Sequence, residues 1–132
     1  MERTENRAIS VAKEYLRNQG YTVEDVSRGK GPQSEHRGYD LVAHKAEETL
    51  KIEVKGCTRP WGIPDPYVTE FDSERRLVAD FLYVVYFSDS ETQLCAIPRD
   101  ALKPEDIVPK HGYRIRSRFK NKKSLEGYLR AL

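Results

Sequence analysis

With 132 residues, the chain has the length of a single domain, which is long enough for one core and too short for two. Hydrophobic residues make up 38% and charged residues 33%, no apolar run is long enough to cross a bilayer, and the charged start lacks a signal-peptide core. These features exclude a membrane protein and favour a cytoplasmic location. The net charge is only +2, but residues 110–132 hold eight Lys or Arg and one acidic residue, so the rest sums to −5.

The first elements predicted are a helix and a strand. Residues 4–19 have a helical pattern that Thr4 can cap, and its apolar face consists of Ile9, Ala12, Tyr15 and Leu16. Gly20 suits the left-handed residue that often follows a helix end. Residues 21–26 then alternate as in a strand.

A hairpin follows a loop. Residues 27–38 contain three glycines and show no periodicity, which is typical of a surface loop. Residues 39–43 form a short predicted strand, residues 44–49 a polar turn, and residues 50–55 a strictly alternating second strand. After another loop, over 56–67, we expect a helix that starts at Thr69 or Asp72 and ends near Ala79.

The second half of the chain adds more strands. Residues 81–87 are apolar throughout, as in a central strand that is covered on both faces. Residues 93–97 form a neighbouring strand, and a short helical turn follows near Asp100. We expect a strand over 113–120 and a last helix, capped by Ser124, with Leu125, Tyr128, Leu129 and Leu132 on one face. This order indicates a single mixed α/β domain over 1–132, with a basic C-terminal segment 110–132.

The hairpin brings together three residues that carry chemistry. If its turn centres on Ala46 and Glu47, Asp40 lies opposite Glu53, and strand alternation puts Lys55 on the face of Glu53. Two adjacent carboxylates repel each other unless a cation such as Mg²⁺ neutralises them, and a nearby lysine can hold an attacking water. The same pattern also fits a solvated hairpin face, and the residues alone leave both interpretations open.

The stretch GYDLVAHKAEETLKIEVKG, residues 38–56, resembles the PD-(D/E)XK nuclease superfamily, which includes many restriction endonucleases. Within it, the chain is most similar to the family of domains at the C-terminus of the plant protein NO VEIN, over about residues 5–100. The motif positions are Gly38-Tyr39-Asp40-Leu41 and Ile52-Glu53-Val54-Lys55-Gly56, with Cys57 where the family has Thr.

This resemblance implies a restriction-endonuclease-like fold, with a central mixed sheet flanked by helices. It also implies DNA cleavage with Mg²⁺ or Mn²⁺, with Asp40 and Glu53 as metal ligands and Lys55 as the residue that positions the water. Many members add a Glu from the first helix; Glu5 is the candidate here and Glu14 the weaker choice. Tyr39 stands where the named motif has proline.

Basic residues suggest a nucleic-acid contact. Alternation over 113–120 would place Arg114, Arg116, Arg118 and Lys120 in one row that could follow a phosphate backbone. Arg37, in the loop before Asp40, could touch the substrate, and a plain solvated loop is the alternative. The alternative for the row is a charged edge strand that deters aggregation.

Trp61 and the two cysteines are assigned structural roles. Trp61 is expected to pack beneath a loop, and Cys57 and Cys95 are expected to be free thiols.

The leading hypothesis is therefore a metal-dependent DNA endonuclease. The alternatives are a catalytically silent nucleic-acid-binding module or a partner-binding subunit of a larger system. Cutting both strands of a duplex needs two active sites, so a homodimer is also expected.

Overall fold

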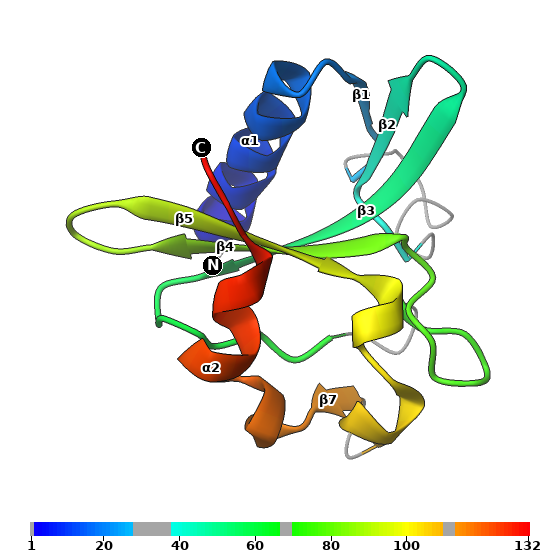
Figure 1. Cartoon of the computed structure of the whole chain (residues 1–132), viewed down its shortest axis with the longest axis vertical. Helices are drawn as coiled ribbons and strands as arrows, with labels where there is room; N and C mark the ends of the chain where they lie inside the picture. Colours follow the sequence, from blue (N-terminus) through cyan, green and yellow to red (C-terminus); the bar gives the residue numbers. More distant parts are fainter. Residues whose placement is uncertain (1, 28–37, 67–69, 110–112) are drawn as a thin grey trace.

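The computed structural model describes residues 2–27, 38–66, 70–109 and 113–132. Its centre is a six-stranded sheet with the order β1-β2-β3-β4-β5-β8 (Figure 1). The strands are β1 (Thr22–Asp25), β2 (Leu41–Lys45), β3 (Glu48–Cys57), β4 (Phe81–Phe87), β5 (Thr92–Pro98) and β8 (Leu129–Arg130). Strands β3 and β4 are parallel and the other neighbours are antiparallel, so the predicted mixed α/β architecture is confirmed.

Helix α1 (Glu2–Asn18) covers one face of the sheet. Its buried residues Ala8, Ile9, Ala12 and Leu16 pack with the inward residues of β2 to β5 in one apolar cluster. The helix ends as predicted at Gly20, whose φ is 95°. There the N–H of Tyr21 donates to the carbonyl of Leu16 and the N–H of Gly20 to that of Arg17, which is a Schellman motif.

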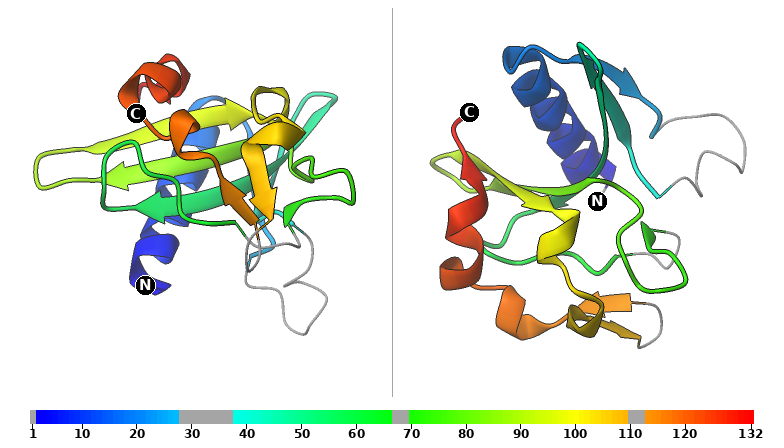
Figure 2. Two further views of the ribbon diagram at one scale, coloured as in Figure 1. Left: turned by 90° about the horizontal axis from the view of Figure 1, so that it is seen from below. Right: turned by 45° about the vertical axis from the view of Figure 1, so that its right-hand side comes forward.

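Short segments cover the other face, as the two views of Figure 2 show. They are η3 (Arg99–Ala101), η4 (Pro104–Asp106), β6 (Ile107–Pro109), β7 (Tyr113–Ile115), η5 (Ser117–Phe119), α2 (Lys122–Leu125) and η6 (Glu126–Tyr128). A second apolar cluster lies between them and the sheet. No helix in the described ranges is long and apolar enough to cross a membrane.

The hairpin register agrees with the sequence. Leu41 pairs with Ile52 and Lys45 with Glu48, so the turn consists of Ala46 and Glu47, and Ala46 adopts a φ of 52°. Simple strand alternation would put Tyr39 on the same face as Leu41. It packs against the second cluster instead, because β2 begins only at Leu41 and strand alternation does not reach back to Tyr39.

Three other elements were predicted wrongly. No helix runs from Asp72 to Ala79, since residues 72–76 form a turn closed by the bridge between Phe71 and Leu77, and a bend follows it; Thr69 lies outside the described residues. The expected strand over 113–120 ends at Ile115, after which η5 begins. The last helix is capped by Asn121 rather than Ser124 and ends at Leu125, because the chain continues into β8 beside β5.

Candidate active site

Strand β3 carries two buried charged residues. In the parallel pair with β4, Glu53 lies opposite Leu82 and Lys55 opposite Val84, whereas Ile52 belongs to the cluster beneath α1. Alternation therefore turns Glu53 and Lys55 toward the second cluster. Their exposed fractions are only 4% and 6%, which excludes the solvated hairpin face that the sequence left open.

Asp40 is fixed against β3 by its backbone and its side chain. Its N–H donates to the carbonyl of Ile52 at 2.8 Å, and its Oδ2 accepts a hydrogen bond of 2.9 Å from the N–H of Val54. The carboxyl group is thereby held beside the intervening residue, Glu53. The structure thus brings Asp40, Glu53 and Lys55 together.

The two carboxyl groups interact strongly. Burial raises the pKa of Asp40 to about 6, although the Val54 N–H, a hydrogen bond with Glu53 and the charge of Lys55 oppose this rise. Burial and the charges of Asp40 and Glu70 also raise the pKa of Glu53, against the opposing charge of Lys55. The hydrogen bond between them acts to lower the pKa of Asp40 and to raise that of Glu53.

Glu70 is a site residue that the sequence did not indicate. It comes from the connection between β3 and β4 and is 5% exposed. Its Oε2 lies 2.7 Å from Nζ of Lys55, while Oε2 of Glu53 lies 3.5 Å from the same nitrogen. Burial acts to lower the pKa of Lys55, but these two carboxylates outweigh it and the pKa is raised, so the lysine is held as an ammonium ion. The sequence around Glu70 has no clear periodicity, and nothing in it distinguished Glu70 from Glu74.

The N-terminal turn of α1 approaches the site at Gly56. A Cβ on Gly56 would lie 2.8 Å from the carbonyl oxygen of Thr4, so only glycine allows this packing. Glu5, on this turn, is exposed, and its charge contributes to the raised pKa of Asp40. The structure therefore places Glu5 within electrostatic reach of the acidic pair.

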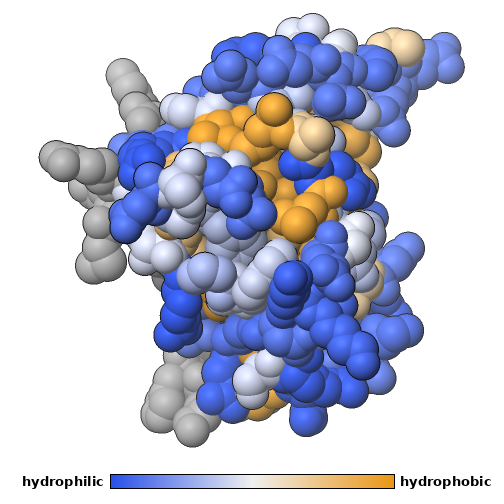
Figure 3. All heavy atoms as spheres, turned by 60° about the vertical axis from the view of Figure 1, so that its left-hand side comes forward, coloured by the Kyte–Doolittle hydropathy of each residue, from blue (hydrophilic) through white to orange (hydrophobic). Residues whose placement is uncertain are grey.

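Glu14 lies elsewhere on α1. It lines a cavity of about 310 Å³ between the C-terminal half of the helix and the chain's last residues, Ala131 and Leu132. Figure 3, which brings the left-hand side of Figure 1 forward, shows an apolar area bordered by hydrophilic side chains on this side of the molecule. This position makes Glu14 a lining residue of a separate cavity.

The basic residues near the C-terminus do not form the expected row. Arg116 donates from Nε to the carbonyl of Glu105 at 2.6 Å, and Arg118 forms a 2.8 Å ion pair with Asp106. Lys120 lies 3.9 Å from Asp65, and Arg114 is exposed on β7. The row fails because η5 replaces the outer half of the predicted strand; Arg37 lies outside the described residues.

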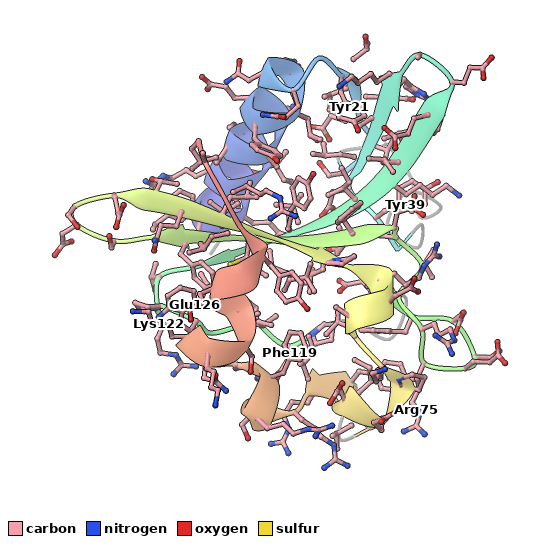
Figure 4. The ribbon with its side chains drawn as sticks, in the orientation of Figure 1. Tyr21, Tyr39, Arg75, Phe119, Lys122 and Glu126 are labelled. Atoms are coloured by element: carbon pink, nitrogen blue, oxygen red, sulfur yellow. The ribbon has the colours of Figure 1, made fainter. Side chains whose placement is uncertain are left out.

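Positive charge is instead spread over the layer opposite α1, which consists of the short segments from η3 to η6 on the other face of the sheet. Figure 4 shows Arg75 and Lys122 far apart on this layer, with Phe119 between them. The layer does reach the candidate active site, because the rings of Phe71 and Tyr113 are in edge contact with centroids 5.3 Å apart. Phe71 follows Glu70, and Tyr113 precedes Arg114.

Trp61 and the two cysteines agree with the predictions. Trp61 packs against the second cluster, with its ring centroid 6.0 Å from that of Tyr86. Cys57 and Cys95 are free thiols.

The donor set fits a hard divalent cation. Two buried carboxyl groups (Glu53 and Glu70) and the partly buried Asp40 face one ammonium group, so the fully ionised cluster would carry a charge of −2. Mg²⁺ and Mn²⁺ suit carboxylate oxygens and retain several waters, which means that two carboxylates suffice. No three His, Cys, Asp or Glu side chains in the described part of the chain are arranged to hold one ion jointly.

Fold and site together define a mixed α/β domain with a buried acidic–lysine cluster at the paired strands β2 and β3. Residues 4–97 match the family described as Protein NO VEIN, C-terminal, and the chain belongs to this family. No curated protein matches the chain.

Among solved structures, the chain is similar to a bacterial homing endonuclease, I-Ssp6803I. The sequence identity is 19% and the TM-score 0.49, over 76% of this chain and 70% of that chain.

Proposed function

We propose that this protein is a divalent-metal-dependent nuclease that hydrolyses phosphodiester bonds in DNA. The observation that carries the proposal is the hydrogen bond from the Val54 N–H to Asp40, because it holds that carboxyl group against Glu53 beside Lys55. Buried like charges of this kind destabilise a fold unless a ligand neutralises them. The resemblance of residues 38–56 to the PD-(D/E)XK motif supports the same conclusion.

Asp40 and Glu53 would hold the Mg²⁺ or Mn²⁺ ion. When bound, such an ion polarises a phosphoryl oxygen and lowers the pKa of water. To hold the ion, Glu53 must be ionised, although burial and the charges of Asp40 and Glu70 raise its pKa. The two carboxylates would then compensate the ion's charge.

Lys55 is placed to act as an ammonium ion. Its raised pKa keeps the proton on Nζ, so that it can hydrogen-bond an attacking water and offset charge that develops on the phosphate. Lys55 does not act as the base that removes a proton in this protonation state. Glu5, which is exposed and within electrostatic reach of Asp40, would orient a water or complete the cation's surroundings.

The proposal is tested by incubating the protein with duplex, single-stranded and branched DNA in the presence of Mg²⁺ or Mn²⁺. We expect cleavage that EDTA stops, and a loss of about a hundredfold or more in Asp40→Ala, Glu53→Ala and Lys55→Ala. Glu14→Ala, at the separate cavity, should cleave like the unmodified protein. Absence of cleavage on all three substrates with either ion would overturn the proposal and favour a nucleic-acid-binding module.

Binding of the DNA is proposed for the basic layer opposite α1. The exposed Arg114 is its nearest candidate to the site, because Tyr113 contacts Phe71 beside Glu70. Double-strand cutting would need a homodimer or a partner, since one cluster serves one strand. Sedimentation of the protein with and without a DNA duplex would test this.

A further inference from the structure

Glu70 is a buried charged residue whose side chain is only partly satisfied by hydrogen bonds. Its carboxylate is buried, and Oε1 has no hydrogen-bond partner among the described residues. A buried acceptor without a partner costs free energy, and a third carboxyl group adds to the repulsion already present between Asp40 and Glu53. The 2.7 Å contact with Lys55 offsets part of this cost, but a buried ion pair adds little net stability to a fold, which suggests that the value of Glu70 lies in function.

The distances around Lys55 indicate what that function is. Nζ lies 2.7 Å from Glu70 but 3.5 Å from Glu53, so the ammonium is hydrogen-bonded to Glu70 and makes only a looser ionic contact with Glu53. An ammonium bound directly to Glu53 would occupy a carboxylate that a divalent cation needs. The shorter contact with Glu70 therefore keeps the ammonium at a distance from Glu53.

Backbone contacts hold Glu70 in that position. Its carbonyl accepts a hydrogen bond of 2.9 Å from the N–H of Val78, and the adjacent Phe71 forms the bridge with Leu77. Leu77 is 1% exposed, so the turn is anchored in the second cluster. The Glu70 backbone therefore has support that does not depend on its interaction with Lys55.

We propose that Glu70 is a positioning residue, which binds the Lys55 ammonium and so keeps the Glu53 carboxylate available to the cation. This inference rests on the proposed function, since it concerns the same metal site. Without Glu70, Lys55 moves onto Glu53 and competes with the cation. The effect of Glu70 on cation binding must therefore depend on Lys55.

The test is a double-mutant cycle on Mn²⁺ binding, measured by calorimetry on the full chain. We expect Glu70→Gln to weaken Mn²⁺ binding by about tenfold, in the range typical of residues that orient metal ligands. In the Lys55→Met background the same substitution should change binding by less than about twofold, because the competing ammonium is gone. Glu126→Gln, an exposed change on η6, is the matched control and should bind like the unmodified protein.

A second measurement does not depend on metal binding or on the folding of Lys55→Met. In ¹⁵N-correlated NMR spectra of the protein in EDTA, the Lys55 ammonium should give a protected resonance, which Glu70→Gln should shift or broaden and Glu126→Gln should leave in place. Circular dichroism should show that Glu70→Gln remains folded.

Each result has a definite meaning. Equal weakening by Glu70→Gln with and without Lys55 would show that Glu70 acts as a ligand or by its charge alone, and would overturn the inference. An unchanged affinity or an unchanged Lys55 resonance would also overturn it. If the unmodified protein binds no Mn²⁺ and cuts no DNA, the proposed function itself fails, and the inference with it.

Discussion

The N–H of Val54 donates a 2.9 Å hydrogen bond to Oδ2 of Asp40, which joins the residue just before β2 to the middle of β3. Val54 itself faces the cluster beneath α1 and is fully buried, so the donor is fixed by the core. The position of the Asp40 carboxyl group thus depends on the same packing that turns Glu53 and Lys55 to the opposite face. Core and site are coupled through this one backbone group.

Divalent cations should stabilise the protein through Asp40. At pH 8, excess Mn²⁺ should raise the melting temperature, because an ion that binds only the folded state adds to its stability. A concentration a hundred times the dissociation constant would add about 2.7 kcal/mol. Asp40→Asn should melt at the same temperature with Mn²⁺ as with EDTA in differential scanning calorimetry. A rise as large as that of the unmodified protein would remove Asp40 from the metal site.

Without divalent ions, stability should increase as the pH falls from about 7 to about 4. The pKa of Asp40 is about 6 in the folded protein against an ordinary value of 3.8, so the folded state binds this proton more tightly than the unfolded state. Protonation through this range should raise the free energy of unfolding by roughly 2 to 3 kcal/mol. Urea denaturation in EDTA at several pH values would measure it.

A substitution isolates the contribution of Asp40 to this pH dependence. Asp40→Asn can still accept the Val54 hydrogen bond but carries no charge, so it should be more stable than the unmodified protein at pH 8 and show a flatter profile between pH 4 and 7. Asp89→Asn, an exposed change in the turn after β4, should leave the profile as it was. If Asp40→Asn were less stable than the unmodified protein at pH 8, the charge of Asp40 would not destabilise the fold by repelling the neighbouring carboxylates.

The ion pair between Lys13 and Asp25 should have the opposite effect, because it should lose its contribution to stability as the pH falls further. Burial acts to raise the pKa of Asp25, but hydrogen bonds from Lys13 and Ser27 outweigh it and the pKa is lowered. The stability from this pair is present above the ordinary pKa of 3.8 and is lost as the pH falls below it. Lys13→Met should therefore cost about 1 kcal/mol at pH 7, since both side chains are partly exposed, and much less at pH 2.

The site hairpin was predictable because a short turn and strict alternation determine which residues face each other. The alternation over 50–55 assigned Glu53 and Lys55 to one face, and the turn at Ala46 and Glu47 determined the register. The position of Asp40 followed from that register, even though β2 begins one residue later. The apolar run 81–87 likewise predicted the central strand β4, which is buried on both faces.

Glu70 and the basic residues were not predictable for physical reasons. Glu70 reaches Lys55 from a connection whose shape depends on long-range burial of Phe71 and Leu77, not on a local period. Residues 113–120 alternate like a strand, but only Tyr113–Ile115 have a partner strand, and the chain then turns so that Arg118 can pair with the buried Asp106. Alternation predicts a strand only where a neighbouring strand is present.

Gly56→Ala should displace the first turn of α1 from the candidate active site. An added Cβ would lie 2.8 Å from the Thr4 carbonyl oxygen and 3.1 Å from Cβ of Ala8, so the first turn of α1 must shift. We expect a loss of about 1 to 3 kcal/mol in the free energy of unfolding, together with a fall in cleavage at temperatures where the variant is fully folded, because Glu5 is displaced. Gly127→Ala is the control, since its Cβ would meet no atom within 4 Å.

Two arginines four residues apart, Arg114 and Arg118, should respond differently to the same truncation. Arg118 pairs at 2.8 Å with Asp106, whose side chain is 7% exposed, whereas Arg114 is exposed on β7 and has no hydrogen bond or ion pair among the described residues. Arg118→Ala leaves a buried carboxylate without its cation and should cost about 1 to 3 kcal/mol in stability, while Arg114→Ala should change it by less than about 0.5 kcal/mol. If Arg114 contacts a phosphate, Arg114→Ala should also reduce the slope of log K for DNA binding against log salt by about 1. Fluorescence anisotropy over a range of salt concentrations measures that slope, and an unchanged slope would show that the DNA does not reach β7.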